Sequence, residues 1–204
     1  MRKAILYIHG KGGSAEEAAH YRPLFPNCDV IGIEYTAQTP WEAKEEFPQL
    51  FRSLCQKYDS VCVIATSIGA FFTMSALAEQ PIQQAFFISP VVDMEKLILD
   101  MMSWDNVTEE ELRMRKEIET AFGETLSWDY LCYVRQHPVQ WTVPTHILHG
   151  DKDNLTSMET VSTFAMASQT DVQLATQSML ALVKVLRRSM SLTSLLLLQS
   201  DRIT

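Results

Sequence analysis

The sequence SVCVIATSIGAFF occupies residues 60–72 and joins two apolar elements. Residues Ser60–Thr66 are almost continuously apolar, which is typical of a strand buried on both faces of a parallel sheet. Residues Ile68–Gln80 are also mostly apolar, which favours a helix packed under such a sheet. Ser67 therefore lies where a buried strand passes directly into a helix.

The residues around Ser67 have the sizes that a sharp turn requires. A turn from strand to helix crowds the positions two before and two after its centre, so both must be small. Ala65 and Gly69 meet this requirement. The turn would project the hydroxyl of Ser67 above the sheet, at the positive end of the helix, where a nucleophile is accessible. The alternative is an ordinary helix N-cap, for which serine is also common.

Strand-like and helical segments alternate outward from this turn. The strands are expected at residues 4–8, 29–35, 60–66, 85–89 and 143–149. The helices between them are expected to begin near residues 14, 39, 68 and 156. This alternation predicts an α/β fold, in which a mostly parallel sheet carries helices on both faces.

Two of the helix starts have N-terminal signatures. Ser14 with Glu17, and Thr39 with Glu42, have the spacing of a capping box. The first helix is expected to reach about Phe25. The second is expected to run to about Tyr58 and to kink or break at Pro48, because proline lacks the N–H that a helix interior uses.

Residues 94–140 contain helix signals and many charges but no clear strand. We expect one domain over residues 1–204, with 94–140 as an all-helical cap insertion over the strand ends. Residues 165–204 form a third, atypical segment: they contain no Gly, Pro, aromatic residue or His, and carry four basic and two acidic side chains. From Val172 onward their apolar residues have helical spacing, which predicts an amphipathic helix.

The sequence HGKGGS at residues 9–14 follows the first expected strand. Glycines allow backbone N–H groups to approach a ligand closely. In an acyl-transfer site, the N–H of Lys11 or Gly12 would join that of Ile68 in an oxyanion hole. A phosphate-binding loop is the rival, but the spacings of both common phosphate motifs are absent. A plain strand-to-helix turn is the third interpretation.

The sequence HGDKD at residues 149–153 closes the last expected strand. A carboxylate on such a loop could orient a catalytic histidine. Asp153 is the first candidate and Asp151 the second, while Asp93 after the strand 85–89 is a weaker one. The alternative is a loop with two solvated acids.

Together the motifs HGKGGS, ATSIGA, FFISPVVDM and THILHGDKD resemble the α/β-hydrolase superfamily, and in particular small bacterial serine hydrolases with a short helical cap. The resemblance covers residues 3–164. It implies that Ser67 is the nucleophile, that Lys11 and Ile68 supply oxyanion N–H groups, and that Asp153 is the acid of the triad.

The resemblance also implies that residues 94–140 shape an acyl pocket. Gly10 and Gly12 would lie beside the bound acyl group. Trp104 and Trp128, and less directly Trp141, could line the pocket, although packing within the cap is the simpler interpretation of each.

The family places its catalytic histidine 25–30 residues beyond the acid, after one more strand. Here that window is about 178–185, which contains no His, and none occurs after His149. The expected strand and glycine loop are not recognisable either. A reading-frame shift at the 3′ end of the gene, a natural variant that lost the base, and a histidine from a partner chain are the three explanations.

The charge and the remaining features of the composition restrict the classes of function that this chain could have. A formal charge of −8 argues against a broad nucleic-acid or acidic-membrane surface. We see no membrane span, no signal peptide and no metal or redox spacing of the four Cys, so we expect a cytoplasmic protein with free thiols and no cofactor. The function expected is hydrolysis of a small-molecule acyl ester, thioester or amide, impaired by the missing histidine. The alternative is a non-catalytic relative that binds an acyl ligand or a protein partner.

Overall fold

The computed structural model describes residues 2–150, 153–168 and 171–175. In this part of the chain, six strands form one sheet in the order β2-β1-β3-β4-β7-β8, and all neighbouring pairs are parallel. The strands are β1 (Lys3–Ile8), β2 (Asp29–Ile33), β3 (Ser60–Thr66), β4 (Gln84–Ile88), β7 (Thr145–Gly150) and β8 (Asp171–Ala175). The five strands expected from the sequence are confirmed, with end shifts of at most two residues.

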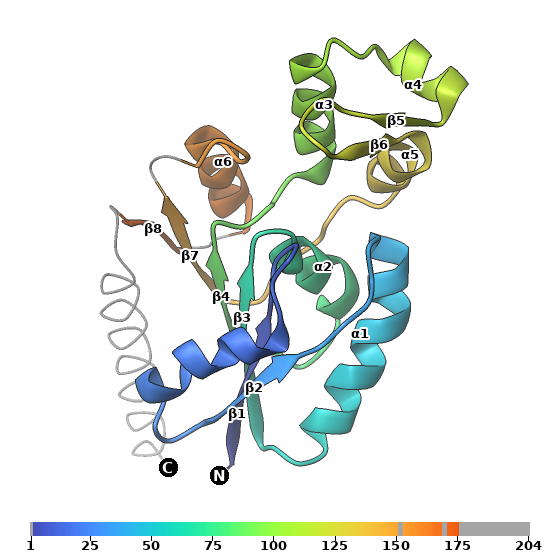
Figure 1. The fold of residues 1–204 in the computed structure, drawn as a ribbon. Helices are drawn as coiled ribbons and strands as arrows, with labels where there is room; N and C mark the ends of the chain where they lie inside the picture. The colour runs from blue at the N-terminus through green and yellow to red at the C-terminus, as the bar shows by residue number, and fades with distance from the viewer. Residues whose placement is uncertain (1, 151–152, 169–170, 176–204) are drawn as a thin grey trace.

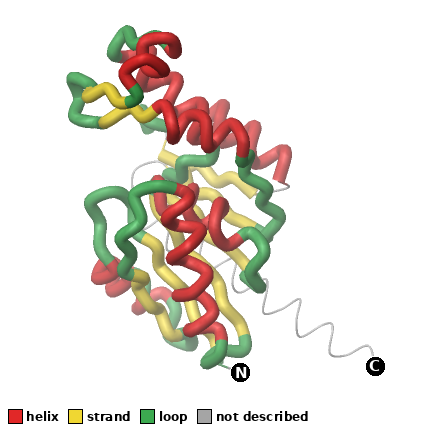
Figure 2. Tube along the Cα trace, turned by 90° about the vertical axis from the view of Figure 1, so that its right-hand side faces the viewer, coloured by secondary structure: helices red, strands yellow, loops and turns green. Residues whose placement is uncertain are grey.

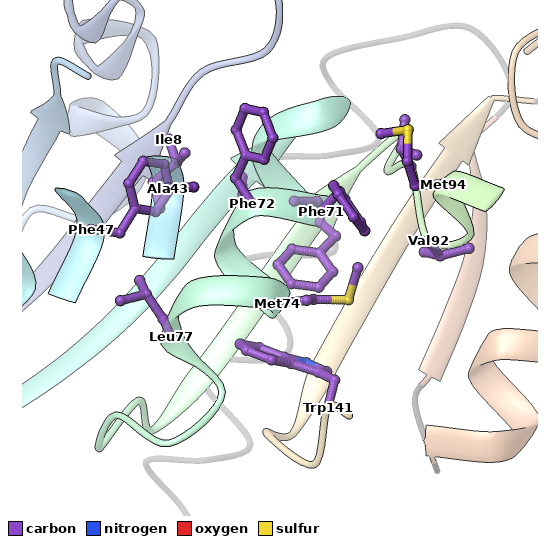
Figure 3. Close-up of a cluster of buried hydrophobic side chains, with 14 of the residues drawn as sticks. Ile8, Ala43, Phe47, Phe71, Phe72, Met74, Leu77, Val92, Met94 and Trp141 are labelled. Atoms are coloured by element: carbon purple, nitrogen blue, oxygen red, sulfur yellow. The ribbon is translucent and has the colours of Figure 1, made fainter. Parts of the chain in front are cut away.

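Two apolar clusters cover the two faces of the sheet. The larger cluster joins β1, β3 and β4 to α1 (Pro40–Cys55) and α2 (Ile68–Leu77), which lie side by side on one face (Figures 1 and 2). Figure 3 shows Phe47 of α1 and Phe72 of α2 within it. On the other face, the described covering consists of two 3₁₀ segments, η1 (Ala15–His20) and η2 (Arg22–Leu24).

The predicted helix over residues 14–25 is wrong in type, because the chain forms the two 3₁₀ segments instead. The side chain of Ser14 makes no capping hydrogen bond. The carboxylate of Glu17 accepts a hydrogen bond from the hydroxyl of Tyr7 in the sheet. Glu17 is therefore engaged by tertiary structure, which outweighs the local capping pattern.

The capping box at Thr39 and Glu42 is confirmed, since both of its hydrogen bonds are present. Of the kink or break predicted at Pro48, a break is wrong, because α1 continues through the proline to Cys55. Phe47 and Phe51, on either side of the proline, are both 2% exposed. Burial of these large rings holds both halves of the helix on the sheet and offsets the single hydrogen bond that proline removes.

The insertion between β4 and β7 stands above the carboxyl ends of the strands in both ribbon views (Figures 1 and 2). Its helices are α3 (Met94–Trp104), α4 (Glu109–Arg115) and α5 (Trp128–Gln136). It is not all-helical, because β5 (Glu117–Glu119) and β6 (Thr125–Ser127) form an antiparallel hairpin. Strands of three residues are too short to give a recognisable alternation, which is why the sequence did not reveal them.

The part of residues 165–204 that the structure describes continues the fold. Helix α6 (Met158–Ser168) begins one turn after Asp153, and β8 then pairs with β7 from His146↔Asp171 to Gly150↔Ala175. The predicted helix from Val172 is therefore wrong over residues 172–175, which pair with the edge of β7. The rest of that predicted helix lies outside the described residues.

Candidate active site

Ser67 has a strained backbone at the junction of β3 and α2. Its φ of 51° and ψ of −125° lie in a region that side chains other than glycine rarely adopt. The Ser67 N–H donates to the carbonyl of Ile88, at an N···O distance of 3.1 Å. The Ser67 carbonyl accepts from the N–H groups of Ala70 and Val91, both at 3.1 Å. These bonds hold a conformation that costs about 1–3 kcal/mol and that clusters at functional sites.

The side chain of Ser67 makes no capping hydrogen bond to α2, although the residue occupies the N-cap position. The N-cap explanation for this serine is therefore wrong. Within the described residues no hydrogen bond engages its hydroxyl. The side chain is only partly buried, so the hydroxyl is accessible from the carboxyl edge of the sheet.

The small residues around Ser67 are required by close approaches of neighbouring backbone. A Cβ atom on Gly69 would lie 2.2 Å from the carbonyl oxygen of His9. A Cβ atom on Gly10 would lie 3.0 Å from the Cβ of Ser67. The loop after β1 therefore packs directly against the turn at Ser67.

The loop after β1 is fixed by hydrogen bonds on both sides of Gly10. The Gly10 carbonyl accepts from the N–H of Gly13 at 3.1 Å and lies 2.8 Å from Nδ1 of His9, which therefore carries the proton. The hydroxyl of Tyr35 donates to the His9 carbonyl at 2.7 Å, and the two rings stack at 4.2 Å. Burial raises the pKa of Tyr35 to about 12, so this donor stays protonated at neutral pH.

Two backbone donors of this region have no acceptor among the described residues. They are the N–H groups of Lys11 and of Ile68, in the first turn of α2; the N–H of Gly12, the alternative to Lys11 in the loop after β1, likewise has none. The first N–H groups of a helix lack intrahelical partners and favour negative charge. Both groups are therefore available to a ligand, and Gly12, with φ of 72°, provides the turn beside them.

Asp153 follows β7 and is anchored by the backbone. One of its carboxylate oxygens, Oδ1, accepts from the N–H groups of Leu155 and Thr156 at 2.9 and 3.1 Å. The other, Oδ2, lies 4.0 Å from Nδ1 of His149. Asp151 lies outside the described residues. Asp93 caps α3 through the N–H of Lys96 and so has a structural explanation.

All five histidines fall within the described residues, and none is hydrogen-bonded to Ser67. His149 is 1% exposed, and its Nε2 donates to the Thr156 carbonyl at 3.0 Å. His9 is buried against Tyr35. The remaining three lie on η1, at the end of α5 and in β7.

The tryptophans have three different environments. Trp104 is 48% exposed and contacts the ring of Phe122 edge-on, with ring centres 5.9 Å apart. Trp128 is half-buried and packs against the large apolar cluster. Trp141 is 4% exposed, donates from Nε1 to Thr145 at 2.7 Å and packs in the core beside Phe87 (Figure 3). Trp141 is therefore excluded from a pocket lining.

Sequence reasoning missed one contact that crosses the candidate site. The ammonium of Lys11 forms an ion pair with the carboxylate of Glu124, in the turn of the β5–β6 hairpin. The two residues are 113 positions apart. No local pattern could reveal this pair, because the hairpin itself was not recognisable.

Other features of the described residues have no role at Ser67. A groove of about 510 Å³ lies between α3, α5 and α6; of the predicted site residues only Asp93, the weaker candidate acid, lines it. No cluster of three His, Cys, Asp or Glu side chains in the described ranges could hold a metal ion. Across the same ranges, no helix is long and apolar enough to cross a bilayer.

No protein-family model and no curated protein matches the sequence. Solved structures do match. Est1E from Butyrivibrio proteoclasticus is 16% identical with a TM-score of 0.73, over 93% of this chain and 86% of that chain. Alpha/beta hydrolase domain-containing protein 10 from mouse is 15% identical with a TM-score of 0.70, over 92% of this chain and 88% of that chain. A thioesterase domain from the curacin biosynthetic pathway is 14% identical with a TM-score of 0.56, over 91% of both. At these identities the similarity is one of fold.

Replacing Gly69 by alanine should destabilise the protein by about 1–3 kcal/mol, because the new methyl group meets the His9 carbonyl. Gly150→Ala is the matched control, since the nearest atom to its Cβ is the Ser89 hydroxyl oxygen at 3.9 Å. Urea denaturation followed by circular dichroism measures both. Equal midpoints for the two variants would contradict the close packing of this loop on the turn.

Proposed function

We propose that this chain, which has the α/β-hydrolase fold, is a serine hydrolase of small acyl esters, thioesters or amides with Ser67 as its nucleophile. The observation that carries the proposal is the strained conformation of Ser67, whose hydroxyl caps no helix and engages no described residue. Strained backbone conformations cluster at functional sites, which supports a catalytic role for Ser67.

The neighbouring residues support acyl transfer. The hydroxyl oxygen of Ser67 would attack the carbonyl carbon, and the carbonyl oxygen would receive the negative charge. The N–H groups of Lys11 and Ile68 would stabilise that charge as an oxyanion hole. The leaving group would depart with a proton, and water would then release the acyl group from Ser67. Asp153 would serve as the acid that orients a histidine.

No hydrogen bond joins the Ser67 hydroxyl to a histidine, and we propose that its proton has no histidine acceptor. A serine hydroxyl is a weak nucleophile at neutral pH without an adjacent base. Losing one member of a triad costs several orders of magnitude in rate, while oxyanion stabilisation and binding remain. We therefore propose that this chain is severely impaired in turnover, although its oxyanion donors and nucleophile remain in place.

The absence of a histidine beside Ser67 also favours a second candidate function. A non-catalytic relative could bind an acyl ligand, or a protein partner, through the insertion over residues 94–140. In that case, acyl ligands should raise the melting temperature without being consumed, by an amount that grows with their concentration. Failure of a broad acyl panel to shift the melting temperature would remove ligand binding from consideration.

A fluorophosphonate probe should label Ser67 only slowly. Mass spectrometry of the intact protein measures the labelled fraction, and peptide mapping places the label. Ser67→Ala should abolish labelling, whereas Ser89→Ala should not. Ser89 is the matched control, because it also follows a central strand and has a positive φ, of 42°.

A chain whose residues after 175 are replaced by a histidine-containing segment should be labelled about 10³-fold faster or more, as expected for a restored base. Rapid labelling of the present chain would instead mean that another group acts as the base. Labelling that survives Ser67→Ala would overturn the assignment of the nucleophile.

A further inference from the structure

Two large aromatic side chains of the insertion are exposed next to each other. Trp104 ends α3, and Phe122 lies in the turn of the β5–β6 hairpin. They are 48% and 45% exposed, and their rings meet at 69° with centres 5.9 Å apart. Isolated exposed apolar residues are ordinary, but two aromatic rings in mutual contact at the surface call for an explanation.

The turn that carries Phe122 is rigidly held. The N–H and hydroxyl of Thr120 both donate to the carbonyl of Glu124 at 2.8 Å, and Gly123 takes the positive φ of 84° that closes the turn. The N–H of Ala121 donates to the carboxylate of Asp105 at the end of α3, at 3.3 Å. The turn is thereby tied to the helix that carries Trp104. The exposed rings are therefore held in place by ordered structure and do not lie on a loose loop.

A continuous set of contacts connects this pair with Ser67. Gly10 packs against Ser67, and the next residue, Lys11, forms the ion pair with Glu124. Glu124 lies two positions after Phe122 in the same turn. The ion pair therefore ties the turn that carries Phe122 to the candidate oxyanion loop, and the turn belongs to the insertion above the carboxyl edge of the sheet (Figure 1).

We propose that Trp104 and Phe122 bind an uncharged aromatic group of the substrate while its carbonyl lies at Ser67. This inference rests on the proposed function for the location of the carbonyl, and it adds the substrate class: aryl-bearing acyl compounds. The edge-on geometry leaves ring surface free for a third ring, and such contacts contribute about 0.5–1.5 kcal/mol beyond burial alone.

The chemistry of the surroundings favours a small aromatic ligand. Of the charges in contact with the hairpin turn, those of Lys11 and Glu124 pair with each other, and the carboxylate of Asp105 accepts from the N–H of Ala121, so each already has a partner. A protein partner needs roughly 800 Å² on each side for a stable interface, which two side chains cannot supply. Binding of a single aromatic ring requires only the two side chains of the pair.

Binding of two rigid carboxylates tests the inference without requiring catalysis. 2-Naphthoate has the planar rings, and decahydro-2-naphthoate has the same carbon skeleton without them. Ligand-observed NMR titration of the full chain and of its Ser67→Ala variant should give a preference of about three- to tenfold for naphthoate in both. Phe122→Leu, which keeps apolar bulk, and Trp104→Leu should each reduce that preference.

Met114→Ala is the control, because Met114 is 68% exposed on the same insertion but lies outside the pair. It should leave the preference unchanged. Equal affinity for the two carboxylates in the parent chain, or a preference that survives both leucine variants, would overturn the inference. A naphthoate preference without labelling of Ser67 would support the aromatic site and count against the hydrolase, and labelling without the preference would do the reverse.

Discussion

The strained turn at Ser67 is the constraint on which the rest of the site depends. Its backbone conformation costs about 1–3 kcal/mol, and complete burial of one large apolar side chain contributes about as much. Helix α2 buries several such side chains, Phe71, Phe72 and Met74 among them, against the sheet (Figure 3). The apolar character of β3 and α2 is therefore what allows a serine to be held in a conformation that glycine would adopt more easily.

Close packing at the same turn also fixes the position of the loop after β1. Because Gly69 leaves no space between α2 and the His9 carbonyl, the loop after β1 is placed against the turn at Ser67. The parallel sheet then brings Asp153 and the insertion to the same edge, since the carboxyl ends of parallel strands lie together. A histidine hydrogen-bonded to Ser67 is not part of this arrangement within the described residues.

Sequence patterns predicted the parts that depend on local chemistry. The alternation of apolar runs and helix signals was sufficient to predict five strands. The small residues at 65 and 69 were sufficient to predict the turn at Ser67. Sequence patterns failed where tertiary contacts determine the local structure. The Glu17 carboxylate accepts a hydrogen bond from Tyr7 instead of capping a helix. Residues 171–175 form a strand because they pair with the edge of β7. The pair of Lys11 with Glu124 could not be foreseen, because it joins two loops that only the fold brings together.

The central claim is that Ser67 is a poised nucleophile without its own base, and chemical rescue by imidazole tests it most directly. The rate of acylation of Ser67 by 4-nitrophenyl acetate is measured from the release of nitrophenolate, at increasing concentrations of imidazole, against the Ser67→Ala variant as background. We predict a slow rate that rises in proportion to neutral imidazole and is lost in the variant. A fast rate that does not depend on imidazole, and that titrates near the pKa of histidine, would contradict the account.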